Sequence, residues 1–424
     1  MAARRSVAVV GGGWAGLAAA VEAVRLGHAV TLFEMAAQLG GRARRVDIAG
    51  LTLDNGQHIL IGAYLETLAL LQTVGVNAGQ AFVRSPLRLI GPDGAGLRLK
   101  AGSPIVAFAG AVLRQRGWRA RDRVALLVAA TGWALRGFRC DAGLTVAALT
   151  AALPASIREQ LIDPLCVAAL NTPTSDASAT VFLRVLRDAL FSGPGCADLL
   201  LPRVDLSALL PEPARRWLEN AGAELRLARR VQSLAAHRDM WALDGEPFDR
   251  VVLATTASEA ARLTAAIAAP WARVAAALRY EPIVTVYLRS PGARLPEPML
   301  ALRCDDRSPA QFVFDRGQLG GLQGLFAFVV SGAQAWVDRG IEATSQATLQ
   351  QAQEALGAHW REPLQLVQTL TEKRATFRCT PGLQRPAMVI APGLHAAGDF
   401  VAGPYPATLE GGVRSAAQAV RGFL

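Results

Sequence analysis

The sequence predicts an α/β fold, in which a parallel β-sheet built from both ends of the chain carries a second domain inserted in two excursions. Three observations support this prediction. An apolar segment at 7–10 ends in closely spaced glycines and continues into a helical pattern. A second apolar run, 29–34, ends in an acid, and a third, 394–399, ends in Gly-Asp near the other end of the chain.

The glycines after the first strand have the G-x-G-x-x-G spacing of a dinucleotide-binding turn. Gly11 permits the tight turn, Gly13 lets the backbone approach a pyrophosphate, and Gly16 lets the following helix pack closely on the strand. The turn also contains Trp14 and Ala15, where the helix N-terminus presents free N–H groups to phosphates. These residues therefore predict a Rossmann-like domain.

Two further elements follow the glycine turn. Glu34 lies 21 residues after Gly13, a spacing suited to a carboxylate that binds a ribose 2′-hydroxyl, which favours FAD or NAD over NADP. The loop 39–43 contains two glycines and then Arg42, whose guanidinium can form a fork for phosphate. The alternative for this loop is an ordinary glycine-rich turn with a solvated arginine.

Composition and charge indicate how many domains the chain has and which kinds of partner it is expected to bind. A chain of 424 residues with 52% hydrophobic residues suits two or three domains. The net charge of +10 comes almost entirely from arginine, which either reflects a GC-rich genome or attracts anionic lipid headgroups. The arginines are scattered, so nucleic-acid binding is not expected. Five cysteines without C-x-x-C spacing predict no metal site and a reducing cytoplasm.

Two apolar runs, 101–113 and 124–135, flank a basic stretch. Both are too short to span a bilayer. They resemble helices that lie in a membrane interface, with Trp118 and Trp133 at headgroup level. The alternative is two buried helices joined by a basic loop. A cleaved signal is not expected, because the first apolar run is needed as a strand.

The remaining segments complete the two excursions. Helices are predicted over 153–190, with the stretch 163–173 broken by prolines at both ends. From residue 223 onwards the pattern predicts a β-meander and then a return strand into the parallel sheet. Apolar strands at 283–288 and 324–330 predict a mixed sheet that forms the floor of a substrate chamber.

The C-terminal segment predicts a second contact with the dinucleotide. Gly398 and Asp399 can place a carboxylate beside the ribityl chain and pyrophosphate of a flavin. A helix that begins near 407, with Thr408 and Leu409 in its first turn, aims its N-terminus at the flavin N1–C2=O edge. The alternative is an ordinary strand-to-helix crossover.

Several motifs resemble known flavoproteins. The GGRA loop and the C-terminal AGD…PATLEGGVRS are similar to the FAD-dependent amine-oxidase/phytoene-desaturase superfamily. The middle motifs resemble the hydroxysqualene dehydroxylases of bacterial hopanoid synthesis, over essentially the whole chain; these motifs are LDNGQHILIGAY, DPLCVAALNTP, ATVFLRVLRDALF and DLLLPRVDLSALLPEPA. The stretch 400–405 departs from the expected pattern, which is more polar and often contains Trp.

The resemblance implies FAD as the cofactor and two domains. It implies that Val231 contacts the adenine of FAD. The polar cluster around Gly56 and Gln57 enters an apolar strand and needs polar partners, which a cofactor edge could supply. The alternative is a hairpin in which Asp-Asn-Gly is plain turn chemistry. The expected FAD-binding domain comprises 1–63, 198–263 and 391–424, and the expected substrate and membrane-facing domain comprises 64–197 and 264–390.

The family reaction removes the hydroxyl of hydroxysqualene and delivers a hydride from the reduced flavin N5 to an allylic cation, which gives squalene. Departure of the hydroxyl as water needs a general acid or a strong hydrogen-bond donor. The candidates by position are Asp54, His58, Tyr405 and Glu410. His58 is favoured because imidazole titrates near neutrality, and the alternative is that it only bonds backbone or cofactor.

The resemblance also implies a C30 isoprenoid that enters from the bilayer, squalene-pathway enzymes as partners, and a cytoplasmic protein on the inner face of the cell membrane. Three alternatives stay open. One is a desaturase of a carotenoid precursor or other polyprenyl, with the opposite electron flow. Another is a non-catalytic FAD-binding scaffold. The third is an amine oxidase, which would carry an aromatic pair at the flavin face.

Overall fold

The strand that opens the chain lies inside a six-stranded sheet of the order β10-β2-β1-β14-β21-β20. The computed structural model describes residues 4–48, 50–115 and 117–423. The sheet contains β1 (Ser6–Val10), β2 (Ala29–Phe33), β10 (Glu224–Arg226), β14 (Arg250–Leu253), β20 (Val389–Ala391) and β21 (Leu394–Ala396). All its pairings are parallel except that between β20 and β21. The predicted parallel sheet from both chain ends is therefore confirmed.

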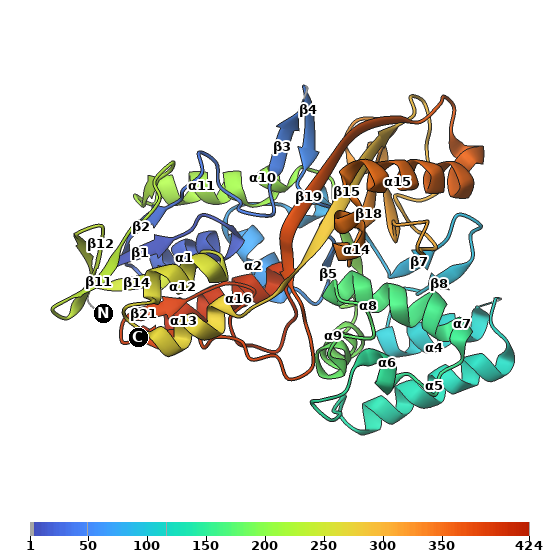
Figure 1. Cartoon of the computed structure of the whole chain (residues 1–424), viewed down its shortest axis with the longest axis horizontal. Helices are drawn as coiled ribbons and strands as arrows, with labels where there is room; N and C mark the ends of the chain where they lie inside the picture. Colours follow the sequence, from blue (N-terminus) through green and yellow to red (C-terminus); the bar gives the residue numbers. More distant parts are fainter. Residues whose placement is uncertain (1–3, 49, 116, 424) are drawn as a thin grey trace.

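Burial explains why these short apolar runs are strands. The last four residues of β1 and the last three of β14 are buried, as parallel strands covered on both faces must be. Helix α1 (Trp14–Arg25) packs against α16 (Leu409–Arg421), so the first and last helices of the chain lie side by side (Figure 1). The first helix begins at Trp14, inside the glycine motif itself.

The predicted β-meander is present as an antiparallel sheet of β11 (Leu234–His237), β12 (Met240–Leu243) and β13 (Glu246–Phe248). The return strand is β14, which pairs with β1. The first strand after residue 223 lies elsewhere, because β10 pairs with β2 at the edge of the parallel sheet. Ala228, with a φ of +53°, lies in the turn that separates β10 from β11.

The second large sheet has the order β16-β17-β18-β15-β19. Its strands are β15 (Tyr280–Arg289), β16 (Met299–Ala301), β17 (Phe312–Asp315), β18 (Leu325–Val330) and β19 (Gln365–Phe377). All four pairings are antiparallel, so the prediction of a mixed sheet is wrong. The loops from β16 to β18 are too short for the crossover that a parallel pair requires. In Figure 1, α14 (Gln334–Arg339) and α15 (Ile341–Leu356) lie against this sheet.

A group of helices from the first excursion lies at the lower right of Figure 1. It comprises α4 (Pro104–Arg114), α5 (Ala120–Leu135), α6 (Val146–Leu149), α7 (Ala155–Ile157), the π-helix η1 (Arg158–Ile162), α8 (Asp163–Leu170) and α9 (Ala179–Phe191). The predicted break before Pro164 is wrong, because α7, η1 and α8 form one continuous helical run. The missing N–H of Pro164 falls where the hydrogen-bond pattern changes from π to α.

Helices α4 and α5 are each buried on one face and exposed on the other. Trp118 and Trp133, expected at headgroup level, are only 3% and 5% exposed, so that expectation is wrong. The Trp118 Nε1 donates a hydrogen bond to Gln160 Oε1 at 2.9 Å, which satisfies the indole inside the protein. Within the described residues, no helix has both the length and the apolar character needed to cross a bilayer.

Smaller elements connect these layers. They are β3 (Arg45–Ile48), β4 (Leu51–Asp54), β5 (Leu60–Ile61), α2 (Leu65–Thr73), α3 (Ala78–Ala81), β6 (Phe82–Ser85), β7 (Arg88–Ile90), β8 (Gly96–Arg98), β9 (Leu199–Pro202), α10 (Leu206–Leu209), α11 (Pro211–Asn220), α12 (Ala257–Thr264), α13 (Ala269–Ala276), η2 (Gly317–Leu319) and η3 (Gly357–His359). Strand β9 pairs with both β5 and β6, which joins the first excursion to the segment that follows it.

Candidate active site

One cavity extends from the glycine turn to the antiparallel sheet. Its polar end is lined by the residues around Gly11, Gly13 and Glu34. Its apolar end is lined by side chains of β15, β17, β18 and β19, and by α8 and α9. The chain therefore places a dinucleotide cradle and an apolar chamber in a single connected space.

The glycine turn is as tight as its spacing predicts. Gly11 has a φ of +108°, and a Cβ there would lie 2.5 Å from the Ala254 carbonyl oxygen. A Cβ on Gly16 would lie 1.8 Å from the Gly11 oxygen, because α1 packs directly on the turn. Helix α1 has no side-chain cap and no acid in its first turn. Its first N–H groups are therefore open to an anionic ligand.

Trp14 and Ala15 line the cavity beside the glycine turn. The Trp14 Nε1 donates to the carbonyl oxygen of Ala43 at 2.9 Å, and so ties the start of α1 to the second glycine loop. A β-bridge between Gly13 and Gly40 joins the same two loops. The two glycine-rich segments therefore form one surface, although Gly16 contributes by packing and lies outside the cavity lining.

Glu34 lies at the end of β2 and is 8% exposed. Its Oε2 accepts from the Gly12 N–H at 2.6 Å, and its Oε1 accepts from the Ala36 N–H at 2.8 Å. These two bonds hold the carboxylate in the cavity wall beside the glycine turn. Each carboxylate oxygen retains a lone pair, which suits a ribose hydroxyl as a further donor.

Arg42 has a different environment from the open phosphate fork that the sequence predicts. It lines the cavity, but its guanidinium donates to the Ala375 carbonyl at 2.6 Å and to Asp399 Oδ1 at 2.8 Å. Gly398 and Asp399 line the cavity as well. The arginine therefore joins the N-terminal loop to β19 and to the C-terminal loop, with its fork already occupied.

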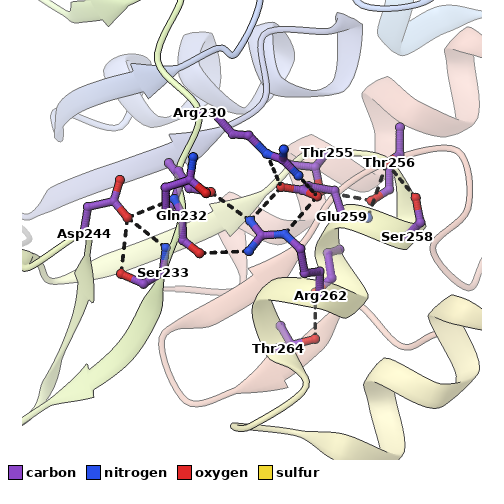
Figure 2. A network of polar contacts seen from close by, with 12 residues as sticks. Arg230, Gln232, Ser233, Asp244, Thr255, Thr256, Ser258, Glu259, Arg262 and Thr264 are labelled. Atoms are coloured by element: carbon purple, nitrogen blue, oxygen red, sulfur yellow. Dashed lines mark hydrogen bonds and ion pairs between the residues drawn. The ribbon is translucent and has the colours of Figure 1, made fainter.

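Figure 2 shows a network of polar contacts in which Arg230 and Arg262 both bond to Glu259. Val231 lines the cavity, and its carbonyl oxygen accepts from Arg262 at 2.9 Å. Arg262 and Arg230 both pair with Glu259, at 2.7 and 3.1 Å. Helix α12, which carries Glu259 and Arg262, thereby fixes the backbone at this end of the cavity. The sequence offered no signal for this contact, because its partners are about 30 residues apart in unlike elements.

The loop after β4 connects the cavity to the antiparallel sheet. Gly56 and Gln57 line the cavity. The Gln57 side chain donates to the Tyr287 hydroxyl at 2.9 Å and accepts from Arg316 at 3.0 Å. Both partners belong to the second excursion, Tyr287 in β15 and Arg316 directly after β17. The loop is thereby held against the chamber floor.

Asp54 does not reach the cavity surface, so it is badly placed to protonate a substrate. It is 4% exposed, and its carboxylate accepts from the Leu206 N–H at 2.9 Å and pairs with Arg316 at 3.4 Å. Burial raises the pKa of Asp54 to about 6, and Arg316 opposes that shift. Its contacts give it a structural role at the junction of the loop and the sheet.

His58 lines the cavity, but it is not the near-neutral acid that the sequence predicts. Burial lowers its pKa to about 4, and the Arg42 charge adds to this effect. The imidazole is therefore neutral at pH 7. Its Nδ1 is buried and has no hydrogen-bond partner within the described part of the chain. A buried polar atom beside the glycine loops is suited to a polar edge of a bound cofactor.

Glu410 is also excluded as a substrate acid by its position. It is fully buried and lies outside the cavity lining. Its carboxylate accepts from the N–H and the hydroxyl of Thr67, at 2.9 and 2.7 Å, and pairs with Arg414 at 2.6 Å. These contacts fix the start of α2. The neighbouring Thr408 and Leu409 do line the cavity, and the Thr408 hydroxyl caps α16 by accepting from the Gly411 N–H at 3.0 Å.

Tyr405 is the remaining sequence candidate, and it lines the cavity together with Tyr64 and Asp188. Burial raises the pKa values of both phenols, so they remain protonated at neutral pH. The guanidinium carbons of Arg184 and Arg414 each lie 5.3 Å from the centroid of the Tyr405 ring. Tyr64 and Asp188 were not predicted, although both lie within the family-like motifs quoted above.

The chamber end is largely apolar. The residues that line it include Ile283, Phe312, Phe314, Val329 and Leu370 from the antiparallel sheet, and Val167, Ala168, Ala169 and Val185 from α8 and α9. Such a surface excludes water and binds hydrocarbon through the hydrophobic effect.

Comparisons with known proteins agree with this geometry. The family model described as flavin containing amine oxidoreductase matches residues 14–422. Proteins named hydroxysqualene dehydroxylase from Sinorhizobium fredii and Rhodopseudomonas palustris are each 29% identical to the chain, over 97% of it and 96% of their own length. The predicted resemblance is therefore confirmed. An oxidoreductase structure from Methanosarcina mazei is 15% identical with a TM-score of 0.76, and the match covers 98% of this chain and 100% of that one.

The glycine cradle, the buried carboxylate at the end of β2 and the buried His58 Nδ1 fit FAD as the ligand of this cavity. FAD is the cofactor, and the protein is an oxidoreductase that depends on it. The chain belongs to the flavin-containing amine oxidoreductase family.

Proposed function

We propose that the protein converts hydroxysqualene to squalene by reductive dehydroxylation. The observation that carries this proposal is the chain-long similarity to proteins named hydroxysqualene dehydroxylase. The cavity supports it, because an apolar chamber suited to a C30 hydrocarbon adjoins the flavin cradle. We place the reaction in hopanoid synthesis, following the resemblance of the middle motifs.

Bound FAD, when reduced, would supply the hydride for the allylic carbon. The chain has three tasks around it. The apolar walls hold the hydrocarbon and keep water away from the reacting carbon. The two glycine loops orient the cofactor. The third task is proton donation to the departing hydroxyl, and we assign it to Tyr405, because it is the one sequence candidate that both lines the cavity and carries a proton at pH 7.

The test is a single turnover without oxygen. The FAD-loaded protein is reduced with dithionite, mixed with hydroxysqualene, and assayed for squalene by chromatography and for oxidised flavin by absorbance. We expect one molecule of squalene to form for each flavin that is reoxidised. The Tyr405→Phe variant should bind FAD normally and react about 100-fold more slowly, as expected for loss of a general acid.

The alternatives give different results in the same assay. A desaturase would leave hydroxysqualene unchanged and would reduce its oxidised flavin with phytoene. An amine oxidase would reduce its flavin with an alkylamine. A scaffold protein would be yellow and would turn over none of these compounds. Any of these three outcomes would overturn the proposed reaction.

We also propose that the exposed sides of α4 and α5 dock on an anionic membrane surface. Six exposed apolar side chains on these two helices make up this α4–α5 face: Ile105, Val106, Leu113, Val124, Val128 and Leu135. Val128 is 66% exposed and Leu135 is 84% exposed. The exposed Arg119, Arg121 and Arg136 lie at the ends of α5, where they complement lipid phosphates. The docked protein would be on the cytoplasmic face of the membrane and would receive its substrate from the bilayer.

Vesicle flotation tests this contact. The protein should float with phosphatidylglycerol vesicles and much less with phosphatidylcholine vesicles. The double variant Val128→Ser, Leu135→Ser should lose most of this binding, because each change removes an apolar side chain from the bilayer. Ile341→Ser, at an exposed apolar position on α15, is the matched control. Equal flotation of the wild type, the double variant and the control would show that the α4–α5 face does not bind the membrane.

A further inference from the structure

Three polar residues of the cavity lining come from α9 and from the segments just before α2 and α16. Asp188 of α9 lines the cavity, and it is the one charged residue that the described part of 65–197 contributes to the lining. Tyr64, at the start of α2, and Tyr405, before α16, line the same cavity. Tyr64 has Tyr405 and Glu410 as electrostatic neighbours, and Tyr405 has Asp188.

We propose that Tyr64, Asp188 and Tyr405 form a subsite that binds the hydroxyl group of the substrate and selects an alcohol over the hydrocarbon of the same length. This inference rests on the proposed reaction and adds the residues that recognise its substrate. A hydroxyl entering an apolar chamber loses its water and needs both a donor and an acceptor. A phenol supplies the donor, and the Asp188 carboxylate supplies the acceptor.

The subsite is held in place by charged residues behind it. The Arg184 Nε donates to both Asp188 oxygens, at 3.0 and 3.1 Å. Arg184 and Asp188 are four residues apart on α9, so the helix itself aligns the pair. The Arg184 guanidinium also lies over the Tyr405 ring, with its central carbon 5.3 Å from the ring centroid. We therefore treat Arg184 as a positioning residue, because it lies outside the cavity lining.

A second arginine, Arg414 of the C-terminal helix α16, also contacts Tyr405. Arg414 lies 5.3 Å from the Tyr405 ring centroid and pairs with the buried Glu410 at 2.6 Å. Glu410 in turn accepts two hydrogen bonds from Thr67, which lies in the first turn of α2, three residues after Tyr64. The two phenols and the carboxylate thus belong to one connected framework that joins α2, α9 and α16.

With these residues, the proton and the electrons needed for the departure of the hydroxyl can each be assigned a source. The C–O bond breaks, and the oxygen leaves with the bonding electrons and takes the Tyr405 proton to form water. Bound reduced FAD would supply the hydride, whose two electrons form the new C–H bond. Solvent then returns a proton to the phenolate, which the Arg184 and Arg414 cations stabilise in the meantime.

Binding experiments separate hydroxyl recognition from turnover. Hydroxysqualene and squalene are each titrated into the oxidised FAD-loaded protein, and binding is followed by the change in flavin absorbance. Asp188→Asn and Tyr64→Phe should each weaken hydroxysqualene binding by about 10- to 100-fold, as expected for a lost hydrogen bond in a buried site. Squalene binding should change by less than about 2-fold, because it has no hydroxyl to lose.

Arg187→Gln is the matched control, since Arg187 is an exposed arginine on the same helix. It should leave both affinities unchanged. Equal weakening of alcohol and hydrocarbon would mean that the residues only shape the wall, and unchanged affinities would remove them from the site. Either result would overturn the subsite. Failure of the wild-type protein to convert hydroxysqualene would overturn the proposed reaction instead, because the binding preference is measured without turnover.

Discussion

At the scale of single residues, the cavity assigns different tasks to side chains of the same type. Glu34 and Glu410 are both buried carboxylates. Glu34 faces the cavity and accepts from the backbone N–H groups of Gly12 and Ala36, so it can also accept from a ligand. Glu410 faces away and is satisfied by Thr67 and Arg414. Direction, and not residue type, decides which acid is available for function.

Replacing Glu34 should therefore weaken FAD binding. The Glu34→Gln side chain has one acceptor oxygen in place of two, so it loses a bond to a backbone N–H as well as the ribose contact. The dissociation constant of FAD, measured by fluorescence quenching, should rise by about 10-fold or more. Glu224→Gln, at an exposed acid on the neighbouring strand β10, should leave it unchanged. Equal affinities for the two variants would contradict this role.

His58 makes stability depend on pH. Its pKa is lowered by burial to about 4, whereas an unfolded histidine titrates near 6.5. The unfolded chain therefore binds a proton more readily, and the stability present above pH 6.5 is lost as the pH falls towards 4. The urea midpoint of the FAD-loaded protein should fall between pH 7 and pH 5. It should fall less in His58→Gln, and an identical fall would show that His58 is not the titrating group.

At the scale of elements, the contact between α1 and the glycine turn explains why the first helix starts where it does. Gly16 removes the Cβ that would strike the Gly11 oxygen, so α1 can begin at Trp14 and point its N-terminus into the cavity. Trp14 then ties the helix to the second glycine loop through Ala43. The cradle depends on helix packing as much as on loop flexibility.

Gly16→Ala should push α1 away from the turn. The added methyl carbon would lie 1.8 Å from the Gly11 oxygen, and relief of that overlap should cost about 1–3 kcal/mol in the free energy of unfolding. The purified variant should also contain less FAD. Gly117→Ala is the control, because no atom lies within 4 Å of the added carbon. Urea unfolding measures the stability, and the ratio of flavin to protein absorbance measures the FAD content. Wild-type stability and wild-type FAD content in Gly16→Ala would contradict this account.

At the scale of the whole molecule, the cavity is closed by contacts between distant parts of the chain. Arg42 links the N-terminal loop to β19 and to Asp399 near the C-terminus. Asn171, at the end of α8, bonds to Glu281, Thr376 and Gly332, and so joins the first excursion to the second. The motif DPLCVAALNTP therefore ends at a junction between the two excursions. The hydrogen bonds of Asn171 across this junction explain why the motif contains an asparagine.

Breaking the link at Arg42 should loosen the cavity as a whole. Arg42→Met leaves Asp399 and the Ala375 carbonyl without their donor, which should cost about 1–3 kcal/mol and speed the release of FAD. Arg215→Met removes an exposed i,i+4 pair with Glu219 and should change stability by less than about 0.5 kcal/mol. Thermal unfolding and stopped-flow release of FAD test the comparison. Similar effects from both variants would show that the Arg42 link is only a surface contact.

The sequence by itself determined the parallel sheet, the dinucleotide turn and the flavoprotein family. These depend on local features. Glycine spacing, apolar runs and short motifs predict the same local structure whatever surrounds the segment in the fold. The acid after β2 could be predicted for the same reason, since the strand carries it to the cavity edge. Substrate class came from motif resemblance and not from any physical pattern in the residues.

Only the tertiary structure decided which polar groups face the cavity and which are buried. Trp118 and Trp133 fit a membrane interface in sequence, yet neighbouring helices cover them. Asp54 and Glu410 lie close in sequence to cavity-lining residues but point into packed junctions. Tyr64, Asp188 and Tyr405 are each separated by more than a hundred residues, and folding brings them to one cavity. Burial and direction are properties of the packed chain, so no local pattern encodes them.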